Sequence, residues 1–83
     1  MPLERIKQAK KITIGTKQTM KAVQKGAAKA VFVARDADDH VVEPLLKMCE
    51  ERLIEVVTVD TMAELGKASG IQVGAASVAI IEE

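Results

Sequence analysis

The sequence predicts an α/β fold, specifically a three-layer α/β/α sandwich in which a four-stranded sheet is covered by four helices. Segments with helical periodicity alternate strictly with short apolar segments along the whole chain. Loops of about two to six residues separate them, a length typical of compact α/β units. Such alternation favours a sheet with helices on both faces. Because the chain contains no linker and no low-complexity tract, we expect residues 1–83 to form a single domain.

The first half of the chain is expected to contain two helices and two strands. In chain order, these are a helix over 3–10, a strand over 12–14, a helix over 16–25 and a strand over 30–34. Gly15 ends the first strand, and Gly26 stands where a glycine commonly terminates a helix. The inward side of the second helix is expected to carry Met20, Val23 and Ala27. Because the segment 30–34 is apolar throughout, it indicates a central strand covered on both faces.

The second half is expected to continue this alternation. In chain order, it holds a helix that runs to residue 53, a strand over 56–59, a short helix over 62–68, a loop over 70–74 and a strand over 77–81. Pro44 lacks a backbone donor, so we expect the regular part of the long helix to begin near it, after an irregular lead-in over 40–43. The core-facing stripe of that helix is Val42, Leu45, Leu46, Cys49 and Leu53. Asp60 or Thr61 is expected to cap the short helix.

Composition excludes several classes of protein. A hydrophobic share of 48% argues against disorder, and a single Phe without Tyr or Trp argues against sites in which bases stack on aromatic rings. A lone cysteine, Cys49, excludes an internal disulfide and a cysteine zinc site and fits a reducing cytosol. No apolar run approaches the ~18 residues of a membrane span. We therefore expect a cytoplasmic protein with no membrane association.

The net charge of zero conceals an uneven distribution along the chain. Residues 1–35 carry nine basic side chains and one acidic one, whereas residues 36–83 carry three basic and eleven acidic ones. Charge asymmetry of this kind indicates a polyanionic partner. The alternative is that folding intermixes the two halves and leaves no extended charged surface.

The segment that begins at Gly15 is a candidate anion-binding site. A strand ends there, a glycine turns the chain and a helix begins, so that the first-turn N–H groups and the helix dipole favour a negative charge. Three lysines spaced by four residues, Lys17, Lys21 and Lys25, follow on one side of this helix; we call them the lysine row. Like charges at this spacing cost about 0.2–0.5 kcal/mol per pair, which a neighbouring phosphate backbone would offset. The alternative is an ordinary solvated face.

A second candidate segment covers residues 65–77, which contain three glycines and several small residues. Glycine permits positive φ angles and close approach of the backbone to a ligand. Ile71 and Val73 lie in an expected exposed loop, where apolar side chains need a partner. Tight packing of this loop on a helix explains the same residues equally well.

Other clusters that could carry chemistry are weaker. Asp36, Asp38, Asp39 and His40 lack the glycine and closing glutamate of an EF-hand, and His40 has no second His or Cys to bind a metal with it. Turn and cap roles therefore explain this run better. Cys49 belongs to a core stripe and is expected to be a packed thiol. The sequence contains no catalytic constellation, so we expect no enzyme activity, no metal and no cofactor.

Three segments together resemble a known family. They are residues 14–22 (IGTKQTMKA), 33–38 (VARDAD) and 65–80 (LGKASGIQVGAASVAI). In this order, and over essentially the whole chain, they resemble the kink-turn-binding ribosomal protein superfamily of the L7Ae and L30e types, in particular its small bacterial members of the YbxF type. The resemblance implies an L30e-like sandwich that binds kink-turns, which are RNA helices bent at a three-nucleotide bulge beside tandem sheared G·A pairs.

The resemblance also implies roles for individual residues. The helix opened by Gly15 enters the widened major-groove side of the kink, where archaeal and eukaryotic members carry Gly-x-Asn-Glu-x-x-Lys. Gly15 and Lys21 match this pattern, whereas Lys17 replaces Asn and Gln18 replaces Glu, so we expect binding with a larger electrostatic share. The loop over 71–76 covers the bulge nucleotides. The implied RNA-binding residues are Gly15, Thr16, Lys17, Gln18, Lys21, Arg35, Lys67, Ile71, Gln72, Val73, Gly74 and Ala75.

These observations favour a small, non-catalytic protein that binds kink-turns in structured RNA as a monomer. Ribosomal RNA and riboswitch-type RNA are the candidate targets, and association with the ribosome is expected. The first alternative is a protein-interaction module that docks a basic partner through its acidic half. The second is a small anion- or nucleotide-binding enzyme domain that uses the Gly15 helix start.

Overall fold

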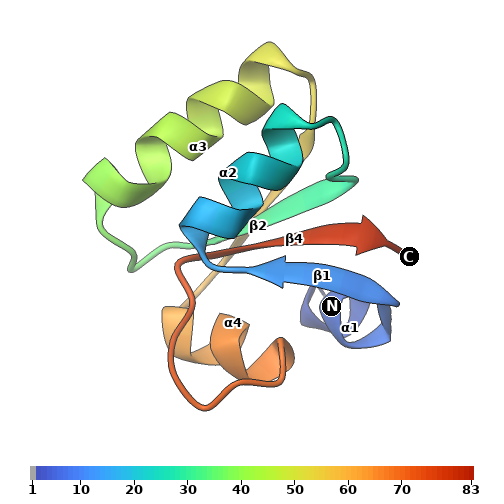
Figure 1. Ribbon diagram of the computed structural model, residues 1–83. Helices are drawn as coiled ribbons and strands as arrows, with labels where there is room; N and C mark the ends of the chain where they lie inside the picture. The colour runs from blue at the N-terminus through green and yellow to red at the C-terminus, as the bar shows by residue number, and fades with distance from the viewer. Residues whose placement is uncertain (1) are drawn as a thin grey trace.

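A computed structural model describes residues 2–83 and contains the expected alternation of helices and strands (Figure 1). In chain order, the elements are α1 (Pro2–Gln8), β1 (Lys11–Ile14), α2 (Thr16–Gln24), β2 (Ala30–Ala34), α3 (Asp39–Glu51), β3 (Glu55–Val59), α4 (Met62–Ala68) and β4 (Ser77–Glu82). The strands form one sheet in the order β1-β4-β2-β3. Because α2 and α3 lie over one face and α1 and α4 over the other, the architecture is the expected α/β/α sandwich.

The directions of the strands determine which loops meet. β2 pairs with β3 in parallel and with β4 antiparallel, and β4 also pairs with β1 antiparallel. The carboxyl ends of β1, β2 and β3 therefore meet the start of β4 at one end of the sheet. At this end the N–H of Gly15 donates to the carbonyl of Ser77 (2.9 Å), and the N–H of Arg35 donates to the carbonyl of Val59 (2.8 Å).

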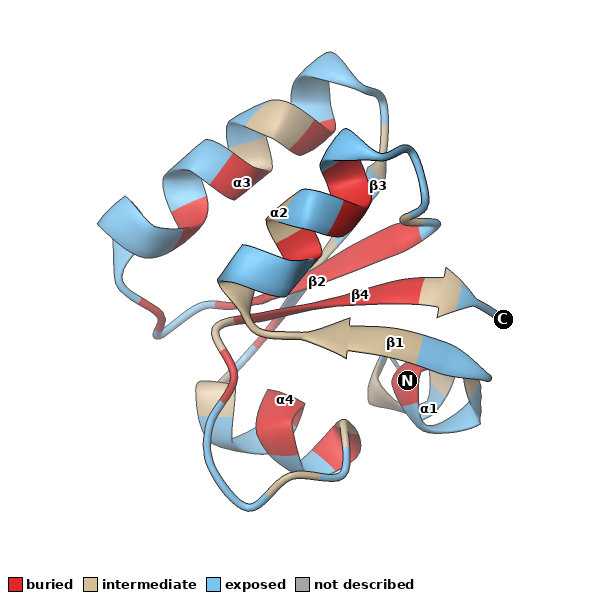
Figure 2. Cartoon of the chain, viewed as in Figure 1, coloured by how far each residue is buried: buried red, intermediate tan, exposed pale blue. Residues whose placement is uncertain are grey.

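The core lies on both faces of β2 and β4. All five residues of β2 are buried, which confirms the prediction of a central strand (Figure 2). The largest fully buried side chains come from four different elements: Phe32 of β2, Leu45 of α3, Leu65 of α4 and Ile80 of β4. Packing of this kind fixes both helical layers on the sheet.

The prediction of an irregular lead-in over 40–43 is wrong, because α3 begins at Asp39 and contains Pro44. Asp38 caps the helix by accepting the N–H of His40 at 2.8 Å, and Val42 is buried within the first turns. Proline at position 44 removes only the donor that would reach the carbonyl of His40, and both residues are exposed to solvent. The cap and the core contacts therefore hold the first turn in helical form.

Two residues expected to face the core are exposed instead. Leu53 is 93% exposed, because α3 ends at Glu51 and the chain reverses through a positive φ of 56° at Leu53. The half-buried Ile54 packs against the core beside that turn, and its N–H donates to the carbonyl of Cys49 (2.9 Å). Ala27 is exposed because α2 stops at Gln24, ahead of the turn through Gly26 (φ 73°).

The remaining predictions for the second half agree with the structure in part. Thr61, one of the two candidate caps, accepts the N–H of Glu64 at 3.1 Å. Cys49 is buried, and burial raises the pKa of its thiol, as expected of a packed side chain. Within residues 2–83, every helix is too short or too polar to span a lipid bilayer.

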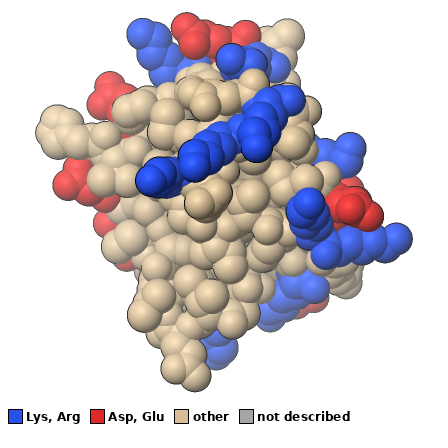
Figure 3. Space-filling view, in the orientation of Figure 1, with Lys and Arg blue, Asp and Glu red and all other residues tan. Residues whose placement is uncertain are grey.

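Basic and acidic residues intermix in some parts of the fold and separate in others. Arg35 approaches Asp60, with 4.0 Å between Nε and Oδ1, so part of the basic half meets the acidic half. On one face, however, basic side chains form a row over α2, and a second basic group lies where β1 begins and β4 ends (Figure 3). Intermixing of the two charged halves therefore describes the surface around Arg35, whereas an extended basic surface is present over α2.

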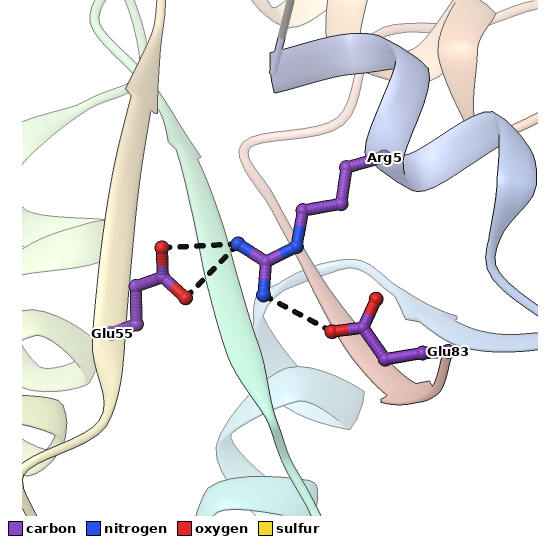
Figure 4. Close-up of polar contacts among 3 residues, drawn as sticks. All are labelled: Arg5, Glu55 and Glu83. Carbon is purple, nitrogen blue, oxygen red and sulfur yellow. Dashed lines mark hydrogen bonds and ion pairs between the residues drawn. The ribbon is translucent and has the colours of Figure 1, made fainter.

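An ion-pair cluster around Arg5 joins three distant parts of the chain (Figure 4). Nη1 of Arg5 donates to both carboxylate oxygens of Glu55 (2.9 and 3.0 Å), and Nη2 donates to Oε1 of Glu83 (3.1 Å). The hydrogen bonds to Glu83 and Glu55 raise the pKa of the Arg5 guanidinium. Because the partners are 50 and 78 residues away, the cluster ties α1 to the start of β3 and to the end of the chain.

We expect Arg5→Gln to lower the free energy of unfolding by about 1 kcal/mol at low salt, since the pairs are partly exposed and screened by solvent. The loss should shrink at high salt, where exposed charges interact less. Urea unfolding at two salt concentrations measures it. Lys7→Gln is the control, because Lys7 forms only an exposed pair with Glu4 (3.6 Å). Equal stabilities of the two variants at low salt would contradict a stabilising role for the cluster.

Candidate functional site

The start of α2 leaves backbone donors open to an external partner. Gly15 precedes the helix with φ 95° and ψ 152°, a conformation that L side chains rarely adopt, and no side chain caps the first turn. The N–H groups of that first turn have no partner within the helix. Combined with the dipole of the helix, they favour a negatively charged ligand.

The lysine row lies on the outer side of α2. Lys17, Lys21 and Lys25 are exposed, whereas Thr19, Ala22 and Val23 face the core. In the described part of the chain, no carboxylate forms an ion pair with a member of the row. The repulsion between the lysines is therefore not relieved by acidic neighbours within the fold, and the row is available to an anionic partner (Figure 3).

The second candidate segment packs closely on α4. A Cβ added at Gly66 would clash with the carbonyl oxygen of Val73, and one added at Gly74 would lie 3.1 Å from Cβ of Met62. The N–H of Ile71 donates to the carbonyl of Gly66 (3.0 Å). Tight loop–helix packing, one of the two interpretations of this segment, therefore explains both glycines.

Individual loop residues differ in exposure. Ile71, which was expected to be exposed, is half-buried and packs against the core, whereas Val73 is 70% exposed. Ala75 is buried, and its N–H donates to the carbonyl of Met62 (3.0 Å), so it shapes the loop without presenting a side chain. Gln72 and Gly74 are exposed. Val73 is thus the apolar side chain that this loop offers to a partner.

Ser77 joins the two candidate segments. Its carbonyl accepts the N–H of Gly15 (2.9 Å), and its fully buried hydroxyl lies 2.9 Å from the hydroxyl of Thr16. The start of α2 therefore lies directly beside the end of the loop that leads into β4. Beside the lysine row, the surface over α4 and this loop is largely free of charge (Figure 3).

The structure does not bring all the predicted residues together. The start of α2 holds Gly15, Thr16, Lys17 and Gln18, next to the loop that contains Ile71, Gln72, Val73, Gly74 and Ala75. Lys21 lies in the last turn of the same helix, further from the loop. Arg35 follows β2 at the same end of the sheet, but on the side of β3 and beside Asp60. Lys67 is exposed on α4, across the sheet from the lysine row.

Two residues that position the site, Ser77 and Thr13, were not among the predicted site residues. The buried hydroxyl of Ser77 contacts that of Thr16 on α2 (2.9 Å). The hydroxyl of the half-buried Thr13 contacts that of Thr19 on the same helix (3.1 Å). Serine and threonine in short strands are common, and their pattern carries no sign of these partners. Only the packing of α2 on β1 and β4 reveals them.

The alternative sites have structural roles. Asp38 caps α3, and Oδ1 of Asp36 accepts the N–H of Met62 at 2.8 Å. Within residues 2–83, no group of three or more His, Cys, Asp or Glu side chains is arranged to hold a metal ion. The buried Cys49 thiol, with its raised pKa, is unsuited to act as a nucleophile.

Comparison with known proteins gives consistent matches over nearly the whole chain. Residues 2–83 match the ribosomal protein L7Ae/L30e/S12e/Gadd45 family. The chain is 49% identical over 81 residues to "RNA-binding protein YbxF" of Geobacillus stearothermophilus and 44% identical over 81 residues to an "RNA-binding protein" of Bacillus pumilus, covering 98% of this chain and 99% of each relative. The solved structure of the "Giardia lamblia 15.5kD RNA binding protein" matches with a TM-score of 0.89 at 28% identity, covering 99% of this chain and 72% of that one.

We expect Gly66→Ala to displace the loop from α4, because the added methyl group would clash with the backbone of Val73. The free energy of unfolding should fall by about 1–3 kcal/mol, as in other overpacked sites. Amide hydrogen exchange at Ile71 and Ala75, whose N–H groups bind α4, should become faster than in the rest of the core.

Gly26→Ala is the matched control for this variant. It introduces strain at a φ of 73° but meets no atom within 4 Å, and it lies far from the loop in sequence. It should lower stability without selectively exposing Ile71 and Ala75. If the amide hydrogens of Ile71 and Ala75 exchange at the same rate in both variants, Gly66 does not hold the loop on α4.

Proposed function

The chain belongs to the ribosomal protein L7Ae/L30e/S12e/Gadd45 family, and we propose that it is an RNA-binding protein that recognises kink-turns. One observation carries the proposal: the Thr16–Ser77 hydroxyl contact joins the lysine row and the open first turn of α2 to an uncharged loop. A kink-turn offers a matching pair of features, a bent phosphate backbone and extruded bulge nucleotides.

The comparisons support RNA as the partner. The relatives from Geobacillus stearothermophilus and Bacillus pumilus are named as RNA-binding proteins, as is the structural match from Giardia lamblia. These names also agree with the expectation that the protein is not an enzyme. Phosphates supply most of the affinity in protein–nucleic acid complexes, and the lysine row is free to meet them.

Contacts from α2 would both position the RNA and distinguish its bases. Lys17 and Lys21 would neutralise phosphates, which fixes orientation but carries no sequence information. Gln18 is exposed in the first turn of the helix, and its amide oxygen would accept hydrogen bonds from guanine N–H groups. The major groove of regular A-form RNA is too narrow for such contacts, so this readout requires the sharp bend of a kink-turn.

The loop over 71–76 would cover the bulge. Val73 is exposed and apolar and would contact the face of an extruded base, a role that aromatic residues fill in many RNA-binding proteins. The close packing of the loop on α4 would limit the entropy lost on binding.

We further propose that the protein binds as a monomer to ribosomal RNA or another structured RNA. Docking of a basic protein on the acidic half remains the second candidate. A shallow hollow of about 270 Å³ on α3, lined by Asp39, Val42, Glu43 and Leu46, favours it, because acidic groups flank apolar ones there. This candidate requires no preference for kinked RNA.

Gel-shift titration with a kink-turn RNA and a straight counterpart, in which Watson–Crick pairs replace the G·A pairs, tests the proposal. The unmutated protein should bind the kink-turn at least ten-fold more tightly. Gln18→Ala should reduce this discrimination by about ten-fold, as expected for the loss of one base contact. Equal affinity of the unmutated protein for both RNAs would refute kink-turn recognition.

The salt dependence of binding tests the lysine row. The logarithm of the association constant should fall with the logarithm of salt concentration by about 0.9 for each neutralised phosphate. Lys21→Ala should weaken binding to all RNAs and flatten this slope by about one unit. Lys7→Ala, on α1 at the other face of the sheet, should leave the slope unchanged. An unchanged slope for Lys21→Ala would exclude this side chain from phosphate contact.

A further inference from the structure

β3 forms one edge of the sheet and leaves one side of its backbone without a partner strand. In the order β1-β4-β2-β3, only β2 pairs with it among residues 2–83. The N–H of Arg35 donates to the carbonyl of Val59 (2.8 Å), so the backbone of Val59 faces β2. Because backbone groups alternate in direction along a strand, those of Val56 and Thr58 point outward. The edge therefore offers the N–H and C=O groups of these two residues to another chain.

The edge lacks the features that usually prevent the addition of a strand. Edge strands are commonly protected by lysine, by proline or by a bulge. β3 pairs with β2 in regular register from end to end, so no bulge bends it. It contains neither lysine nor proline, and its one charged side chain, Glu55, is held by Arg5. Its five residues are a typical length for a strand in a sheet.

One flank of α3 faces this edge. Glu55 binds Arg5 of α1, so the next side chain of β3, Val56, points to the opposite face of the sheet, where α3 contacts the strand. Nη1 of Arg52 donates to the carbonyl of Gln24 (3.4 Å), which turns one flank of α3 towards α2. The other flank, on the side of β3, carries the residues that line the hollow of about 270 Å³: Asp39, Val42, Glu43 and Leu46.

The surface on both sides of the edge is acidic. Glu50 follows Glu43 by seven residues, about two turns, and so lies on the same flank of α3. Among residues 2–83, neither carboxylate forms an ion pair, and Lys47, the one lysine of α3, binds neither of them. On the face covered by α1 and α4, a second hollow of about 170 Å³ is lined by Pro2, Leu3, Thr58, Val59, Asp60 and Glu64.

We propose that β3 accepts an extended, basic segment of a partner protein as an additional strand of the sheet. The side chains of such a strand alternate between the two faces, and a hollow flanks the edge on each of them. Lysine or arginine suits the α3 side, where the aliphatic stem covers Val56 and Leu46 and the charged head reaches Glu43 or Glu50. A small apolar side chain suits the other side, beside Leu3. Main-chain hydrogen bonds supply affinity, and the charges select the partner.

A second copy of this chain is a poorer occupant of the edge. Pairing of β3 with its own copy brings two acidic flanks together, and like charges on neighbouring strands are destabilising. The proposal does not rest on RNA recognition, because β3 and β1 are opposite edges of the sheet and α2 contacts β1 and β4. A protein contact at β3 is therefore additional to RNA binding and does not replace it.

The probe is a blocked peptide of about seven residues in which lysine alternates with valine, and its counterpart carries glutamine in place of lysine. Titration of the isotopically labelled protein with the lysine peptide should shift the amides of β3 and α3 and leave those of α2 unchanged. The amide hydrogens of Val56 and Thr58 should exchange about ten-fold more slowly in the complex, because they gain acceptors. Those of Val57 and Val59 already face β2. The glutamine peptide should bind about ten-fold more weakly at low salt.

Two pairs of variants separate the main-chain contacts from the charges. Thr58→Pro removes an outward N–H but spares the bonds to β2, and it should weaken binding of the lysine peptide about ten-fold. Thr58→Ala keeps that N–H and should bind like the unmutated protein. Glu43→Gln/Glu50→Gln should weaken binding about three- to ten-fold at low salt. Glu51→Gln/Glu82→Gln removes the same charge from the end of α3 and from β4, and should not.

Urea unfolding checks the stability of each variant. If Thr58→Pro does not fold, the exchange rates of Val56 and Thr58 in the unmutated protein decide the question. The inference is overturned if the peptide protects neither amide, if the lysine and glutamine peptides bind alike, or if the free protein already associates through β3 at the concentration used. These outcomes leave the preference for kinked RNA untouched, so a failure here is distinguishable from a failure of the proposed function.

Discussion

The contact between Thr16 and Ser77 is the constraint on which the candidate site depends. The hydroxyl of Ser77 is fully buried, and Thr16 is the partner that satisfies it. A buried hydroxyl left without a partner costs about 1–3 kcal/mol, so this contact strongly favours one placement of α2 against β4. The positive φ of Gly15 lets its own N–H donate to the carbonyl of Ser77 while the helix that follows turns outward. The glycine start and the loop therefore act as one surface.

Charge at this surface works against the stability of the isolated helix. The lysine row places like charges one turn apart, and Lys17 lies at the end of α2 where the dipole opposes a cation. Ion pairs form elsewhere in the fold, as around Arg5 and between Arg35 and Asp60, but none within residues 2–83 reaches the lysine row. An unpaired row in a protein of zero net charge is consistent with selection for an anionic partner, since neutrality limits attraction to arbitrary polyanions.

Periodicity in the sequence was sufficient to predict the order of helices and strands and the buried strand β2, and the resemblance of three segments indicated the family. It failed where tertiary contacts override local preference: the cap at Asp38 and the burial of Val42 hold a helical turn ahead of Pro44, and a reversal at Leu53 exposes a residue of the apolar stripe. The glycines of the loop were identified, but their role in packing on α4 required the structure. Contacts between residues far apart in the chain, such as Arg5 with Glu83, leave no pattern in the sequence.

Titration of the isotopically labelled protein with a kink-turn RNA, followed by amide chemical shifts, shows whether α2 and the loop over 71–76 bind RNA as one surface. Binding through the joined surface should shift the amides of residues 15–25 and 71–77 together and in proportion, because Ser77 couples the two segments. The amides of α3 should remain near their free positions. Shifts concentrated on α3 and β3, or confined to only one of the two segments, would contradict a single recognition surface built around Thr16 and Ser77.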